Sequence, residues 1–181
     1  MDNKKWYGVK TFVGYEQKVA DLLQSKIESE NMGNIITDIY IPKIERFVFV
    51  RGKLKKKEEL LYAGYIFVKM EKNQMTLNFV RGVKNATGYA GIRNMNEIPT
   101  HITDEEVETM KKKTEEILCE LKPEDRVKVV NHSDPDLNNQ EVTVKEVDSH
   151  KEIAIVSLFE LFGESNEVEV RFDQIEKIKK K

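Results

Sequence analysis

The apolar pattern of this chain changes type near Pro123, and this change constrains the fold more than any other feature. Before Pro123, apolar residues at helical spacing are interleaved with short strand-like runs. After it, only short strands are predicted, separated by turn-rich stretches such as residues 131–136. About 60 residues in such strands bury a core only by curling into a small barrel. The sequence therefore predicts two domains, residues 1–119 and residues 120–181.

The first domain is predicted to be an α+β fold, with helices packed on an antiparallel sheet. Its helices are expected between Gly14 and Asn31, at 76–80, and from a capping box at Thr103–Glu106 through Ile117. The first helix would bury its apolar positions Val19, Leu22, Leu23 and Ile27. The predicted strands are 6–12, 39–41, 47–50, 64–70 and 87–92. Since the run 64–70 is apolar on both alternating faces, it is expected at the centre of the sheet.

The second domain is predicted to be all β, with strands at 127–130, 142–147, 153–159 and 168–172. Apolar residues make up 39% and charged residues 34% of the chain, which is typical of a globular protein. No apolar run reaches the roughly 18 residues of a membrane-spanning helix. The single cysteine, Cys119, has no partner for an internal disulfide, so we expect a cytoplasmic protein without a membrane contact.

Basic residues gather in two places, although the formal net charge is only −2. The lysine-rich end of the chain, 177–181, is one cluster; the other consists of Arg51, Lys53, Lys55, Lys56 and Lys57. Two interpretations stay open for each cluster. It is either a solvent-exposed turn or tail, or a weak contact with DNA or RNA.

No catalytic, cofactor or metal site is predicted. The histidines at 101, 132 and 150 lie far apart in loop-like segments, whereas a metal site needs three or four converging ligands. Cys119 has no neighbouring base to lower the pKa of its thiol, and the glycines at 82, 88 and 91 are too dispersed for a phosphate-binding loop. We therefore expect a binding protein and not an enzyme.

Aromatic residues of the first domain occupy positions that are expected at the edge of its core. They are Tyr7, Phe12, Tyr15, Tyr62, Tyr65 and Phe67. An apolar patch at a protein surface marks a partner site, whereas six buried rings would only form the core, and both readings stay open. The apolar segment 158–163 of the second domain has the same two readings.

Several segments resemble the NusG family of transcription factors. Residues 6–11, 14–19, 40–42, 61–68 and 80–91 resemble its N-terminal NGN domain, an antiparallel sheet with helices. Residues 124–129, 161–163 and 168–178 resemble its KOW domain, a small SH3-like β-barrel. The resemblance covers nearly the whole chain, with the segments in the family's order.

The resemblance implies a function in transcription elongation, pausing, termination and antitermination. The NGN domain would grip the clamp helices of RNA polymerase, and a monomer would recruit the termination factor Rho or a small-subunit ribosomal protein through its barrel. The polymerase-binding residues implied by the resemblance are Tyr7, Tyr15, Tyr62, Tyr65, Phe67, Lys72, Asn73 and Thr76. Those implied for the barrel partner are Leu161, Phe162 and Glu164.

The chain departs from the family pattern at four places. Tyr62-Ala63 replaces the usual Phe-Pro, and Gly82-Val83 stands where some relatives carry an Asn-Thr pair that reads DNA at pauses. Residues 132–140 replace a glycine-rich turn, and Glu164 replaces a common arginine. The alternatives are therefore an operon-specific antiterminator of the same family, or a ribosome-associated RNA-binding KOW protein.

Overall fold

The computed structural model describes residues 3–94, 97–158 and 166–178, which form two compact units. Unit 1 consists of Met1–Lys43 and Leu60–Thr114, and unit 2 consists of Ile44–Glu59 and Glu115–Lys181. The units thus differ from the predicted ranges 1–119 and 120–181, because residues 44–59 make their contacts with the C-terminal part of the chain. The assignment of residues 1–119 and 120–181 to two independently folding domains stays a prediction.

Unit 1 is an α+β fold built on an antiparallel four-stranded sheet, as expected. Its elements are β1 (Lys4–Thr11), α1 (Glu16–Ser29), β2 (Ile36–Tyr40), β5 (Tyr65–Glu71), α2 (Gln74–Arg81), β6 (Ala86–Tyr89) and α3 (Asp104–Glu115). The strand order is β2-β5-β1-β6. Strand β5 is therefore an interior strand, as its two-sided apolar pattern predicts.

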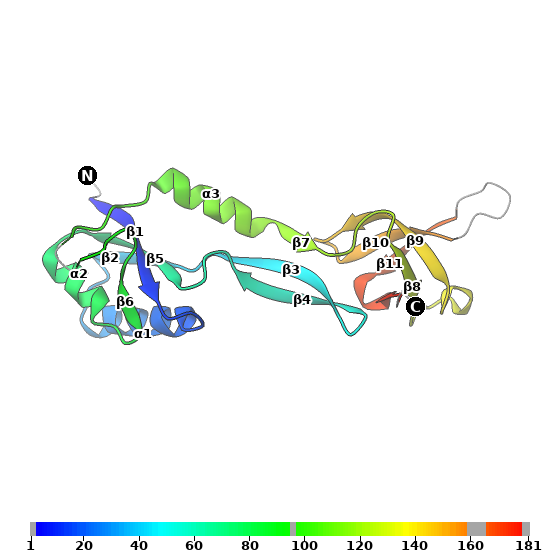
Figure 1. Ribbon diagram of the computed structural model, residues 1–181, viewed down its shortest axis with the longest axis horizontal. Helices are drawn as coiled ribbons and strands as arrows, with labels where there is room; N and C mark the ends of the chain where they lie inside the picture. Colours follow the sequence, from blue (N-terminus) through cyan, green and yellow to red (C-terminus); the bar gives the residue numbers. More distant parts are fainter. Residues whose placement is uncertain (1–2, 95–96, 159–165, 179–181) are drawn as a thin grey trace. The chain divides into compact units, whose positions relative to one another are not determined.

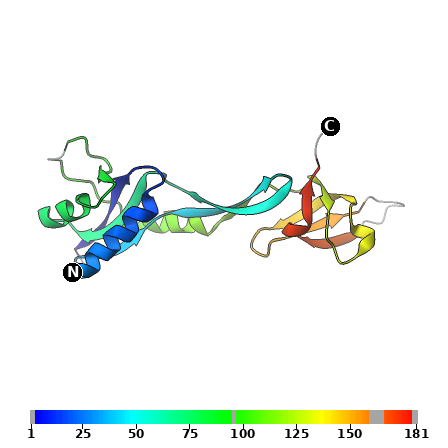
Figure 2. The ribbon, with the colours of Figure 1, turned by 90° about the horizontal axis from the view of Figure 1, so that it is seen from below.

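The sheet of unit 1 is covered on both faces (Figure 1). Helices α1 and α2 pack on one face, where Leu23, Ile66 and Val80 belong to one buried cluster. Helix α3 covers the other face, where its Val107 packs with Trp6 and Phe67. Figure 2 shows α1 and α3 on opposite sides of the sheet. Alternate residues of β1 and β5 thus supply two separate cores.

Two details of the predicted helices are wrong. Leu22 was expected in the core, but it is 39% exposed, because the buried stripe of α1 runs through Ala20 and Leu23 instead. The second detail is the end of the helix that follows Thr103. The capping box of Thr103 and Glu106 is present, and the sequence predicts a helix from it through Ile117. The helix ends at Glu115, and Ile117 begins a strand that pairs with strand β3.

Unit 2 is β-rich, with one sheet of eight strands in the order β11-β10-β9-β8-β12-β4-β3-β7. Its elements are β3 (Lys43–Val50), β4 (Lys53–Leu60), β7 (Ile117–Cys119), β8 (Arg126–Val129), η1 (Pro135–Leu137), β9 (Glu141–Asp148), β10 (Ile153–Ser157), β11 (Glu167–Arg171), η2 (Phe172–Gln174) and β12 (Ile175–Lys177). Strands β4, β7 and β12 were not predicted.

The connection between β11 and β12 requires the five C-terminal strands to curl. In a flat sheet, four spacings of about 4.8 Å would place β12 about 19 Å from β11. The chain from Arg171 to Ile175 reaches at most about 14 Å, and less because Phe172–Gln174 form a 3₁₀ turn. The five strands are therefore bent toward a barrel, which agrees with the expected fold class.

The hairpin of β3 and β4 is part of the core of unit 2. Its two-residue turn places Arg51 at φ 53° and Gly52 at φ 86°, the left-handed pair of a tight hairpin turn. The Phe47 ring meets the Phe172 ring edge to face with 4.8 Å between centroids. Leu54 is buried in the same cluster. The run 47–50 was expected in the first sheet, but this packing and the pairing of β4 with β12 place it in unit 2.

We predict that Phe47→Ala lowers the unfolding free energy of unit 2 by about 3–5 kcal/mol, because it opens a cavity beside Phe172. Val48→Ala is the matched control, since Val48 alternates to the opposite face of β3 and is only half-buried. Denaturant unfolding followed by NMR signals of β8–β12 measures both changes. An unchanged unit 2 in the Phe47→Ala variant would mean that the hairpin is not part of its core.

Candidate functional site

Four apolar side chains of unit 1 are exposed on two neighbouring loops. One loop joins β1 to α1, and the other precedes β5. The exposed fractions are 57% for Phe12, 73% for Val13, 44% for Tyr15 and 39% for Tyr62. We call these four residues the loop patch. Such a group of large apolar side chains at a surface is typical of a partner-binding site.

Glu16 and Gly64 hold the two loops together. The buried Glu16 carboxylate accepts the Gly64 N–H at 2.6 Å, and the Thr11 N–H donates to the Gly64 carbonyl at 2.8 Å. Gly64 has φ +80°, and a Cβ at this position would lie 3.4 Å from Val13 Cγ2. The backbone at Gly64 is therefore fixed by two hydrogen bonds in a conformation that favours glycine. This fixes the relative position of the loops.

The loop patch is supported by the aromatic core beneath α3. The Tyr62 and Phe67 rings meet edge to face with 5.9 Å between centroids. Phe67 is buried against Trp6, and the half-buried Tyr65 packs against the same cluster. Of the predicted polymerase-binding residues, Tyr62, Tyr65 and Phe67 thus lie together, while Tyr15 lies on the adjoining loop.

Tyr7, also predicted as a binding residue, lies away from the loop patch. It alternates to the α1 side of the sheet, where it is 2% exposed in the main core. Burial raises the pKa of the Tyr7 hydroxyl above its usual value. Its ring therefore offers almost no surface to a partner in this structure.

The predicted contact segment at Lys72, Asn73 and Thr76 forms the start of α2. Asn73 caps the helix, because its side-chain oxygen accepts the Thr76 N–H at 2.9 Å. Thr76 is fully buried, and its hydroxyl donates to the Glu71 carbonyl at 2.6 Å. Lys72 is exposed, and so is Met75 at 55%, which sequence reasoning missed. The segment presents Lys72 and Met75 outward, while Thr76 has a structural role.

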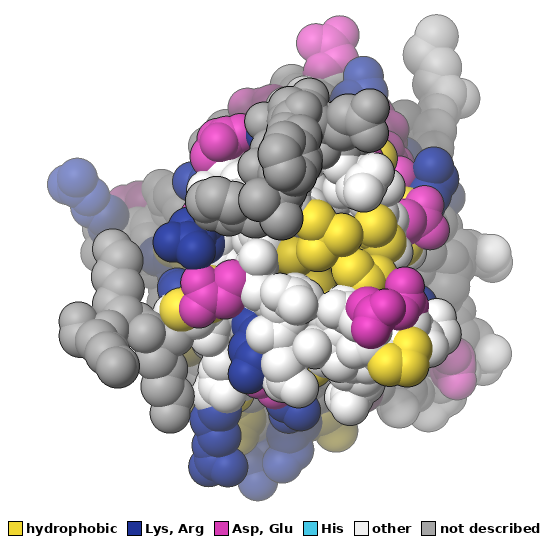
Figure 3. All heavy atoms as spheres, turned by 90° about the vertical axis from the view of Figure 1, so that its right-hand side faces the viewer, with side chains coloured by type: hydrophobic (Ala, Val, Ile, Leu, Met, Phe, Trp, Pro, Cys, Tyr) yellow, Lys and Arg dark blue, Asp and Glu magenta, His cyan; other side chains and the backbone are white. Residues whose placement is uncertain are grey.

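The predicted barrel site, Leu161, Phe162 and Glu164, lies outside the described residues. Leu158 and Val168 lie on either side of that segment along the chain, and both are half-buried against the barrel core. The face of unit 2 seen in Figure 3 has an apolar area with acidic side chains beside it. This face of unit 2 thus combines apolar surface with charged side chains of both signs.

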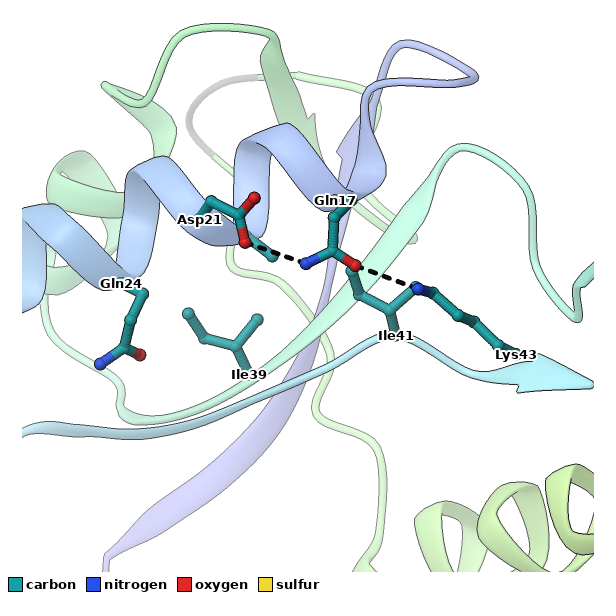
Figure 4. Close-up of a pocket in the computed structure, with 7 residues that line it drawn as sticks. Gln17, Asp21, Gln24, Ile39, Ile41 and Lys43 are labelled. Atoms are coloured by element: carbon teal, nitrogen blue, oxygen red, sulfur yellow. Dashed lines mark hydrogen bonds between the residues drawn. The ribbon is translucent and has the colours of Figure 1, made fainter. Parts of the chain in front are cut away.

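A pocket of about 370 Å³ lies between α1 and the segment from Ile39 to Lys43 (Figure 4). The Gln17 amide donates to Asp21 at 2.9 Å, and Lys43 donates to Gln17 at 3.1 Å. The polar groups on this side of the pocket therefore bond to one another. The pocket contains no histidine, cysteine or hydroxyl nucleophile, and its arrangement suggests no chemistry.

Within the described ranges, no group of three or more histidine, cysteine, aspartate or glutamate side chains is placed to hold a metal ion. Burial raises the pKa of the Cys119 thiol, which disfavours the reactive thiolate. None of the helices in the described part of the chain is long and apolar enough to cross a membrane.

The family comparison and the search for relatives identify the same family. The family described as "Transcription termination factor nusG" matches residues 4–111. The transcription termination/antitermination protein NusG of Staphylococcus carnosus is 33% identical, over 97% of this chain and 96% of that protein. NusG of Staphylococcus epidermidis is 34% identical with the same coverage. The solved structure titled "Domain interaction in Thermotoga maritima NusG" has 27% identity and a TM-score of 0.48, over 97% of this chain and 98% of that one.

We predict that Glu16→Ala destabilises unit 1 by about 1–3 kcal/mol, since the Gly64 N–H loses its buried acceptor. Glu16→Gln is the matched variant, because its amide oxygen can still accept that hydrogen bond, and it should lose less. Thermal unfolding and amide hydrogen exchange at Gly64 measure the two effects. Equal losses for both variants would show that the hydrogen bond to Gly64 is not what holds the loops.

Proposed function

The chain belongs to the NusG family of transcription termination and antitermination factors, which are not enzymes, and on that premise we propose that unit 1 binds the clamp helices of RNA polymerase. In this proposal the bound factor modulates elongation, pausing, termination and antitermination, and the barrel recruits a second partner. It acts in the cytoplasm as a monomer.

The loop patch is the observation that carries this proposal. It offers two exposed tyrosine rings, Tyr15 and Tyr62, next to the still more exposed Phe12 and Val13. Aromatic anchors of this kind contribute about 2 kcal/mol or more each at the centre of an interface. Because the loops are held by Glu16 and Gly64, little conformational entropy is lost when a helix packs on them.

The resemblance implies a set of polymerase-binding residues, and their burial separates those that can touch a partner from those that only hold the others in place. Tyr15, Tyr62 and the half-buried Tyr65 have surface to offer, whereas Phe67 supports Tyr62 from below. Tyr7 and Thr76 are buried, so we exclude their side chains from the proposed interface. On the second contact segment we retain Lys72 and Asn73 and add Met75, which is exposed beside them.

The proposed partner of the barrel is Rho or a small-subunit ribosomal protein. The proposal uses Leu161, Phe162 and Glu164, which follow the half-buried Leu158 in the chain. Glu164 replaces an arginine that is common in the family, and a reversed charge at an interface rim opposes a partner selected for the other sign. We therefore propose weaker Rho binding than in a typical member.

The residues that follow α2 support the proposal that this factor does not cause pausing by reading DNA bases. Gly82 is the C-cap residue of α2, and Val83 is 6% exposed. Neither residue has a side chain that can form a hydrogen bond with a base edge. The second candidate is an operon-specific antiterminator of the same family, which the altered barrel favours through its turn at residues 132–140 and Glu164. Its gene would head a long biosynthetic operon, whereas the gene of a general factor would stand alone or beside secretion and ribosomal genes.

We predict that Tyr62→Ala weakens binding of the full chain to core RNA polymerase by about 10- to 30-fold, equivalent to about 1.4–2 kcal/mol. Leu22→Ala is the matched control, because Leu22 is an equally exposed apolar residue on the outer side of α1. Calorimetric titration with core polymerase measures both. Absence of polymerase binding by the parent chain would refute the proposal, and equal losses in both variants would place the interface elsewhere.

We predict that Glu164→Arg increases the affinity of the full chain for Rho, because it restores the usual sign of charge beside Phe162. NMR titration of the labelled protein with Rho follows the barrel signals, with Lys145→Glu on β9 as the charge-change control. Tight binding by the parent chain, unaffected by Glu164→Arg, would contradict the proposed weak contact.

A further inference from the structure

The lysines of the hairpin separate onto two faces of strand β4. Lys56 faces the barrel: its ammonium lies 2.8 Å from Glu45 and 5.9 Å from the centroid of the core residue Phe47. Leu54, two residues earlier, is buried on that same side. Since side chains alternate along a strand, Lys53, Lys55 and Lys57 point to the opposite, outer face.

The outer face continues across the neighbouring strands. In the register of the sheet, Glu176 of β12 lies opposite Lys53 of β4 on one side and opposite Lys128 of β8 on the other. Residues directly opposite one another share a face of a sheet. We call the four outward lysines the basic strip; they are Lys53, Lys55, Lys57 and Lys128.

Two of the four lysines of the basic strip, Lys55 and Lys57, carry a charge that no acidic residue neutralises among the described residues. Lys53 forms an ion pair with Glu176 at 3.5 Å, and at the far end Glu59 pairs with Arg46 at 3.7 Å. Within the described part of the chain, Lys55 and Lys57 are exposed and form no ion pair. Two acidic residues share this face with the four lysines: Glu176, and Glu141 of β9, which lies opposite Lys128. The strip therefore keeps a net positive charge, on a chain whose net charge is −2.

The groove beside the hairpin tip does not share this character. Its volume is about 1160 Å³, but its lining carries equal numbers of basic and acidic residues. They are Arg51, Lys122, Arg126 and Lys177, with Glu120, Glu124, Asp125 and Glu141. A neutral groove gives no preference for an anion. Of these two surfaces in the described part of unit 2, the outer face of β4 is thus the one with an excess of positive charge.

We propose that the basic strip binds the phosphodiester backbone of a nucleic acid. The strip extends about 14 Å from Lys53 to Lys57, a length over which duplex DNA presents about eight phosphates. The outward residues of the neighbouring strand β3 include Val48 and Val50, and the strip has no aromatic ring on which a base could stack. The contact is therefore independent of sequence and sensitive to salt.

This proposal does not depend on polymerase binding and is tested with the full chain alone. Fluorescence anisotropy measures the binding of a 20-base-pair DNA duplex and a 20-nucleotide RNA, each at several salt concentrations. The test variant is Lys55→Gln with Lys57→Gln, which keeps the Lys53–Glu176 pair that joins β4 to β12. Lys56→Gln is the matched control, with the same substitution on the inner face of the same strand.

The double variant should bind several-fold more weakly than the parent at low salt. Its plot of log affinity against log salt should be less steep by about 1.8 for the duplex, or about 1.4 for a single strand, because two phosphate contacts are lost. Lys56→Gln should match the parent. Comparison of the duplex and RNA arms identifies which nucleic acid is preferred.

Three outcomes would overturn the proposal. The first is that the parent chain binds neither probe at low salt. The second is that the double variant binds as the parent does, or that Lys56→Gln loses as much affinity. The third is that poly-glutamate of equal charge competes as well as the nucleic acid does, which would assign the strip to an acidic protein surface. Unfolding curves of all variants identify any loss that comes from misfolding.

Discussion

The burial of strand β5 on both faces is the constraint on which unit 1 depends. Ile66, Val68 and Met70 face α1 and α2, while Phe67 faces Trp6 and α3. A strand with apolar side chains on both faces needs a layer of helices on each side to exclude water. This requirement fixes α3 against the sheet. It also anchors Phe67, on whose ring Tyr62 of the loop patch rests.

The segments before and after β5 serve different parts of the molecule. The turn before it presents Tyr62 and is tied to the first loop through Gly64 and Glu16. The hairpin that precedes this turn contributes Phe47 and Leu54 to the core of unit 2. The N-terminal half of the sequence thus supplies part of the core of the C-terminal unit. As a result β4 holds its lysines in a defined register, and the strip is a surface of fixed geometry.

Periodicity predicts the elements that are amphipathic or buried on their own. The run 64–70, the capping box at Thr103 and the alternating strand 167–171 each contain enough local pattern to be identified. Strand β4 lacks such a local pattern, because five successive residues among its eight are Lys or Glu and only Leu54 is buried. The candidate site shows the same limit. Aromatic content indicated Tyr15 and Tyr62, but nothing local distinguished the exposed Tyr62 from the buried Tyr7.

The sequence by itself determined the family, the α+β character of the first unit, the β-rich character of the second, and the absence of a catalytic pattern. These properties follow from local periodicity and from family motifs along the chain, and the match to the family agrees with them. Only the tertiary structure decided which aromatic rings are exposed, where residues 44–59 pack, and which lysines share a face. Those properties depend on contacts between residues distant in sequence, such as Glu16 with Gly64 and Phe47 with Phe172, which no local pattern encodes.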